Sequence, residues 1–111
     1  MPSDLVTRQH RFALQIASLL YEAARRGYLV AGGEWYRPGI LARWYAKLGI
    51  GIANSKHCDR LAFDLILRTS TGVYLTKTKD YEELGKWWES MGGTWGGRFL
   101  KADGNHFQEA F

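Results

Sequence analysis

The stretch that decides the fold is Leu61-Ala62-Phe63-Asp64-Leu65-Ile66-Leu67, in which one carboxylate stands among six apolar residues. A nearly unbroken apolar run of this length is typical of a central β-strand. An unpaired carboxylate would cost several kcal/mol to bury there, so Asp64 needs a strong partner. That partner could be a metal ion, a cluster of backbone donors, or a neighbouring arginine such as Arg60 or Arg68.

Three helices are expected around this strand. The first covers about residues 4–26, with Ser3 as its N-cap and Gly27 as its stop. The second has Pro38 in its first turn and ends at Gly49, and the third begins at Asp80. Their apolar residues recur at helical spacing, which predicts buried stripes that include Phe12, Ile16, Leu19, Leu20, Ala23, Trp44, Tyr81, Leu84, Trp87, Trp88 and Met91.

Short strands are expected at residues 28–30, 73–76 and around 106–108, with a glycine-rich loop from residue 94 onward. Helices and hairpin strands in this order predict an α+β domain, with a small, mainly antiparallel sheet and about three helices. The 111 residues are enough for one domain, so residues 1–111 are expected to form a single catalytic domain.

Composition narrows the function classes. The chain is 46% hydrophobic and contains no apolar run near the ~20 residues of a membrane-spanning helix. Its first residues are polar and lack the apolar core of a signal peptide. The single cysteine, Cys58, excludes an internal disulfide and any structural site built from several cysteines. The formal net charge of +4 favours acidic partners without choosing among nucleic acid, an anionic membrane and an anionic cell wall.

Two histidines can share a site with Asp64. His57 lies in a loop seven positions before the carboxylate, and His106 stands at the entry to the last predicted strand. Histidine and aspartate are good zinc ligands, and three protein ligands leave one position of the metal open for catalysis. We therefore expect an open zinc site at the face of the sheet, formed by His57, Asp64 and His106.

The same chemistry needs a base and a group that stabilises charge. Asp103 lies three residues before His106 across a glycine turn, where its carboxylate can accept a proton from the attacking water. The oxyanion that develops on a scissile carbonyl needs a cationic neighbour, for which Arg37 is the candidate. Trp95, in the glycine-rich loop, is the aromatic residue expected to line the cleft.

These residues resemble a known family. The pairs Ser55-Lys56-His57 and Ala62-Phe63-Asp64 are similar to the Ser-x-His-x-x-x-x-Ala-x-Asp pattern of the zinc D-alanyl-D-alanine carboxypeptidases and their relatives, the vancomycin-resistance dipeptidases and phage L-alanyl-D-glutamate endolysins. Downstream, Gly92-Gly93-Thr94-Trp95 and Asp103-Gly104-Asn105-His106 resemble the second signature of that family. Gly33-Glu34-Trp35-Tyr36-Arg37 resembles the segment that carries its substrate-side arginine. The short single-domain phage endolysins are the most similar group.

The resemblance implies one zinc ion per chain on His57, Asp64 and His106, with Asp103 as general base and with Arg37 and Ser55 in contact with the substrate. It implies hydrolysis of a stem-peptide amide of peptidoglycan, with L-alanyl-D-glutamate preferred and D-alanyl-D-alanine carboxypeptidase activity as the alternative. The chain departs from many relatives at three positions: Arg60 replaces a glycine, Pro38 a threonine, and Gln108 a glutamate or tryptophan.

Two functions of other classes remain open. Cys58 with His106 could form a cysteine peptidase, although a reactive cysteine commonly lies at a helix N-terminus and this mechanism leaves Asp64 without a role. The aromatic and basic residues could instead form a non-catalytic module that binds cell wall or nucleic acid.

For the peptidase, we expect a monomer whose partner is the peptidoglycan stem peptide, with no nucleic acid and no stable insertion in a membrane. It is expected to remain in the host cytoplasm until lysis and then act on the wall.

Overall fold

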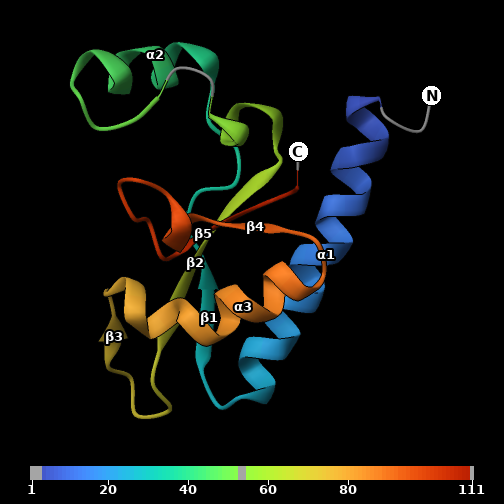
Figure 1. Cartoon of the computed structure of the whole chain (residues 1–111), viewed down its shortest axis with the longest axis vertical. Coiled ribbons are helices and arrows are strands. Elements are labelled where there is room, and N and C mark those ends of the chain that lie inside the picture. The colour runs from blue at the N-terminus through green and yellow to red at the C-terminus, as the bar shows by residue number, and fades with distance from the viewer. Residues whose placement is uncertain (1–3, 53–54, 111) are drawn as a thin grey trace.

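The computed structural model describes residues 4–52 and 55–110, and all structural statements below concern these residues (Figure 1). Its helices are α1 (Leu5–Arg25), α2 (Gly39–Lys47) and α3 (Glu82–Ser90). Its strands are β1 (Leu29–Gly32), β2 (Ala62–Arg68), β3 (Tyr74–Leu75), β4 (Thr94–Trp95) and β5 (His106–Gln108). Three short 3-10 helices complete it: η1 (Lys56–Asp59), η2 (Thr78–Tyr81) and η3 (Gly96–Arg98). None of the helices in the described ranges has the length and hydrophobicity needed to cross a membrane.

The strands form one small antiparallel sheet around β2. Its order is β1-β2-β5-β4, and β3 pairs with the end of β2. The first half of β2 pairs with β5 and the second half with β1, so β2 is the central strand that the apolar run predicted. Three helices with this sheet confirm the expected α+β class.

The two faces of β2 differ. Phe63, Leu65 and Leu67 are buried in the core with α1 and α3, while Asp64 points to the opposite face, because successive side chains of a strand alternate. The carboxylate is therefore not inside the hydrophobic core. Its side chain is 22% exposed on the second face of the sheet, which is the face available to a site.

Helix α1 supplies much of the core. Phe12, Ile16, Leu19 and Ala23 are buried along one stripe, as predicted. Asp4 is the N-cap, since its side chain accepts a hydrogen bond from the Thr7 backbone N–H at 2.8 Å. Ser3, the residue expected in that position, lies outside the described residues. The chain leaves the helix at Gly27.

Helix α2 differs from the prediction. Only Ala42 is buried in it, and Trp44, expected in the core, is 56% exposed. The physical reason is its position beyond the end of the sheet, away from α1 and α3, where no second layer covers it (Figure 1). Met91 was also expected in a buried stripe but is 40% exposed, since it follows the last turn of α3.

Two tryptophans close the core on the α3 side. Trp95 lies in β4, a strand that the sequence did not predict, and it packs so closely on α3 that a Cβ at Gly85 would come within 2.2 Å of its ring. Trp88 contacts Gly93 in the same way, with a Cβ there 2.1 Å from the indole nitrogen. These glycines are therefore required by close packing, and both tryptophans are at most 3% exposed.

Candidate metal centre

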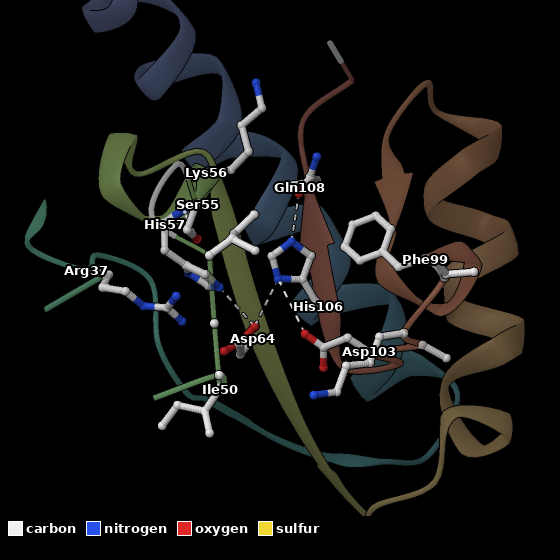
Figure 2. Close-up of a pocket in the computed structure, with 16 residues that line it drawn as sticks. Arg37, Ile50, Ser55, Lys56, His57, Asp64, Phe99, Asp103, His106 and Gln108 are labelled. Atoms are coloured by element: carbon white, nitrogen blue, oxygen red, sulfur yellow. Dashed lines mark hydrogen bonds and ion pairs between the residues drawn. The ribbon is translucent and has the colours of Figure 1, made fainter. Parts of the chain in front are cut away.

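Three side chains from separate elements meet on the open face of the sheet. His57 comes from η1, Asp64 from β2 and His106 from β5, and one possible ligand atom of each lies within 4.8 Å of the other two (Figure 2). His57 Nε2 is 3.2 Å and His106 Nδ1 is 3.4 Å from Asp64 Oδ1. Asp64 and His106 are direct cross-strand partners, which fixes their side chains next to each other.

His57 is held by the turn that contains it. The Ser55 hydroxyl accepts a hydrogen bond from the His57 backbone N–H at 3.1 Å, which caps η1. Arg60, with φ of 58°, ends that turn just before β2. On the ring, Nδ1 lies 3.2 Å from the Trp35 carbonyl oxygen. A carbonyl only accepts, so Nδ1 donates to it, and in the neutral ring the lone pair of Nε2 faces Asp64.

His106 has the opposite tautomer for the same reason. Its Nε2 lies 2.8 Å from Gln108 Oε1, and the two side chains share one face of β5 because they are two residues apart. The amide oxygen accepts a hydrogen bond from the Nε2–H, so in the neutral ring the lone pair of Nδ1 faces Asp64. Gln108, a departure from many relatives in the sequence, thus sets the orientation of a site residue.

The resulting donor set fits a cation. Asp64 Oδ1 is fully buried and forms no hydrogen bond within the described part of the chain. Two nitrogen lone pairs and one carboxylate oxygen that face each other repel unless a positive charge lies between them. Two histidine nitrogens and one aspartate oxygen are ligands that zinc commonly takes, with hydrogen-bond acceptors holding the outer nitrogens.

The pKa values follow this arrangement. Burial raises the pKa of Asp64, but the two imidazoles outweigh it and lower that pKa to about 2. For His106, burial lowers the pKa, but the adjacent Asp64 carboxylate and the Gln108 amide oxygen favour the protonated ring more strongly, so that pKa is raised above its ordinary value. The carboxylate is therefore ionised throughout the neutral range and attracts positive charge to the cluster.

Asp103 is adjacent to the cluster but is not one of its three possible metal ligands. Its Oδ2 is 3.9 Å from His106 Nδ1, and its side chain is 56% exposed to the cleft. The backbone carries it there, because the His106 N–H donates to the Asp103 carbonyl and the Asp103 N–H donates to Gly96. Desolvation raises the pKa of Asp103. A carboxylate in this position is free to exchange a proton with a bound molecule.

Arg37 lies on the other side of the cluster from Asp103 (Figure 2). Its Nε donates to Glu34 Oε1 at 2.9 Å, and Nη2 donates to the same oxygen. The segment is tied to two ligand-bearing elements: the Arg37 N–H donates to the His57 carbonyl, and the Asp64 N–H donates to the Glu34 carbonyl. Sequence reasoning missed Glu34 as the partner of Arg37, although their separation of three residues could have indicated it.

The cluster forms part of the wall of a cleft of about 920 Å³. Residues 49–52 form one side of the cleft and residues 99–102 the other, with Ile50 and Phe99 facing it from opposite sides (Figure 2). Ser55 also lines it but is only 6% exposed, and its hydroxyl is occupied by His57.

Trp95 does not line this cleft, contrary to expectation. It is 3% exposed in the core, and its indole N–H donates to the Gly104 carbonyl at 2.7 Å. It supports the loop that carries Asp103 and His106, and it cannot contact a substrate.

Comparison with known proteins identifies the family and the fold. A family model described as D-alanyl-D-alanine carboxypeptidase matches residues 50–109, a segment that contains the three cluster residues and Asp103. No curated protein matches the chain. Among solved structures, the fold is similar to the L-Ala D-Glu endopeptidase ChiX of Serratia marcescens, with a TM-score of 0.70 and 21% identity over 86% of this chain and 78% of that chain. The family match covers more than half of the chain and confirms the resemblance found in the motifs: the chain belongs to the D-alanyl-D-alanine carboxypeptidase family of peptidases.

Proposed function

We propose that this protein is a zinc-dependent peptidase of the peptidoglycan stem peptide, with one zinc ion on His57, Asp64 and His106. The observation that carries the proposal is the buried Asp64 oxygen, which has no hydrogen bond from any described residue and faces two histidine nitrogens; the other nitrogen of each ring donates elsewhere. Zinc bound there would polarise the scissile carbonyl and acidify the water that attacks it.

We assign the proton transfer, the stabilisation of charge and the positioning of a ligand to separate residues. Asp103 accepts the proton of the attacking water on its carboxylate and passes it to the leaving amine, a role that its raised pKa and open position favour. Arg37, fixed by Glu34, supplies positive charge on the opposite side for the developing oxyanion or for a substrate carboxylate. Ser55 serves the reaction through His57, whose turn it caps.

We propose the L-alanyl-D-glutamate bond as the one that is cut. An endopeptidase needs room on both sides of the scissile bond. A second cavity, of about 280 Å³, shares Ala102 and Asp103 with the main cleft and extends beyond them past Thr78. The similar fold of an L-Ala D-Glu endopeptidase supports the same choice. D-alanyl-D-alanine carboxypeptidase activity is the second candidate, because the matching family model carries that description.

The test measures metal content and activity together. The purified protein should contain about one zinc per chain, and chelation should abolish the release of new amino termini from purified peptidoglycan. Mass spectrometry of the fragments identifies the bond. Asp103→Asn should keep the zinc and the fold while losing most activity, typically about 10²–10⁴-fold. A metal-free protein that zinc does not activate would refute the proposal and favour Cys58 chemistry.

We further propose that the enzyme acts as a lysis protein that meets the wall only after leaving the host cytoplasm. Cells that express it should then remain intact until their inner membrane is permeabilised. Lysis without permeabilisation would contradict this part of the proposal and leave the peptidase activity unaffected.

A further inference from the structure

The net positive charge of the protein comes from one segment. Residues 35–58 contain four cations, Arg37, Arg43, Lys47 and Lys56, and no acidic residue. The rest of the chain is balanced, because the remaining 11 of 15 cations match all 11 acidic residues. Glu34 neutralises Arg37, but Arg43 and Lys47 form no ion pair among the described residues. Arg43 and Lys47 therefore give α2 two cations without an ion pair in the described ranges, within the segment that carries the formal excess of positive charge.

The same helix exposes apolar side chains. Ile40 and Trp44 of α2 and Leu48, the residue at its C-terminal cap, are here called the α2 stripe; they follow each other at a spacing of four residues and are 73%, 56% and 55% exposed. At this spacing the three side chains share one face of the helix. Isolated exposed apolar residues are ordinary, but a row of three large ones on one helix marks an interaction surface.

Neither the core nor the cleft accounts for this face. Ala42 anchors the helix to the body, and Tyr45 is the ring over which the Arg37 guanidinium lies, 5.2 Å away. The α2 stripe is not part of the cleft lining, which includes Arg37 before α2 and residues 49–52 after it. Figure 1 shows α2 at one end of the molecule, apart from the other two helices.

The chemistry of this face matches one kind of partner. Arg43 and Lys47 lie beside the α2 stripe on the helix, giving an apolar row with tryptophan and a flanking row of cations. A helix of this kind lies in the interface of a bilayer, with its apolar side among the lipids and its cations at anionic headgroups. A soluble polyanion would form ion pairs with Arg43 and Lys47 but would not bury the apolar side chains of Ile40 and Leu48.

We propose that α2 is a peripheral membrane-binding element, which docks the protein on an anionic lipid surface through the α2 stripe and its two flanking cations. The partner is a bilayer rich in acidic phospholipid. The protein binds at the surface of this bilayer and inserts no membrane-spanning segment. The proposal is independent of the metal site, because none of these five side chains lines the cleft.

The test is co-sedimentation of the full chain with vesicles. We expect binding to phosphatidylcholine vesicles that contain phosphatidylglycerol and little binding to pure phosphatidylcholine. Raising the salt from about 0.1 to about 1 M shortens the screening length from ~10 to ~3 Å and should weaken the binding. Removal of both cations (R43Q/K47Q) should lower the partition coefficient about 25-fold, at about fivefold for each charge.

The variant I40S/W44S/L48S should lower binding at least about tenfold, since it removes the surface that enters the lipid. Controls are L14S and K86Q, which change an exposed apolar residue of α1 and an exposed cation of α3. Melting curves and hydrolysis of a soluble stem peptide should be unchanged in all variants. The proposal fails if anionic vesicles are not bound. It also fails if binding survives I40S/W44S/L48S while R43Q/K47Q abolishes it, which would identify a polyanion as the partner.

Discussion

Replacing Gln108 by leucine tests how the site holds its second histidine. The amide oxygen of Gln108 is 2.8 Å from His106 Nε2, and His106 is only 6% exposed. Without this acceptor, His106 either keeps a buried N–H unpaired, at about 1–3 kcal/mol, or moves its proton to Nδ1. In the second case the Nδ1–H points toward Asp64 Oδ1, 3.4 Å away, and a metal ion must displace this proton before it can bind Nδ1.

Both outcomes weaken metal binding, and loss of such outer hydrogen bonds typically costs about 10–100-fold in metal affinity, or about 1.4–2.7 kcal/mol. We therefore expect Gln108→Leu to raise the zinc dissociation constant by that factor, measured by competition with a chromophoric chelator. Gln108→Glu keeps an acceptor and should bind zinc at least as tightly as the parent protein. Gln9→Leu, which removes a surface hydrogen bond to the Asp59 carbonyl, is the matched control and should change nothing.

A spectroscopic readout separates orientation from general damage. The chain has three histidines, so imidazole ¹⁵N spectra of the metal-free protein are simple to assign. At a pH where the rings are neutral, His106 should be protonated on Nε2 in the parent and in Gln108→Glu. Unchanged zinc affinity and an unchanged His106 tautomer in Gln108→Leu would refute the reasoning.

Three further predictions concern the ligand charge, pH and the core. Asp64→Asn should lose most zinc binding, measured by metal analysis after dialysis, because it removes the one anionic ligand and leaves the positive metal with two neutral histidines. Normal zinc content in this variant would disprove the assignment. Zinc affinity should fall as pH is lowered from about 8 to about 5.5, and the fall should begin above the ordinary histidine pKa of about 6.5, since the raised pKa of His106 lets protons compete earlier; isothermal titration at several pH values checks this, and a decline starting well below pH 6 would contradict it. Gly85→Ala should destabilise the fold by about 1–3 kcal/mol in chemical denaturation, because the new Cβ would lie 2.2 Å from the Trp95 ring; Lys86→Ala in the same helix should stay close to the parent, and equal stability of both variants would show that Trp95 can move aside.

Much of the fold could be predicted from local pattern. The apolar run of β2 and the stripe of α1 were visible because burial imposes regular periods on the residues that face a core. Strand β4 was not predicted, since two residues between glycines carry no periodicity, and its pairing with β5 depends on a partner distant in sequence. The position of Trp44 was wrong because helical spacing indicates which residues share a face, while the presence of a layer to cover that face is a tertiary fact.

Some features of the candidate site could likewise be predicted from the sequence, and others depended on the tertiary structure. The sequence by itself determined the types of residues that could bind a metal, because a carboxylate in an apolar strand demands a countercharge and the motifs around His57 and His106 supply ligands. It also determined the family. Only the tertiary structure decided that Asp64 lies on the open face of the sheet, that Trp95 belongs to the core, and that Glu34 and Gln108 orient their neighbours. Those facts depend on strand register and on hydrogen bonds between segments far apart in the chain, which no local pattern of residues encodes.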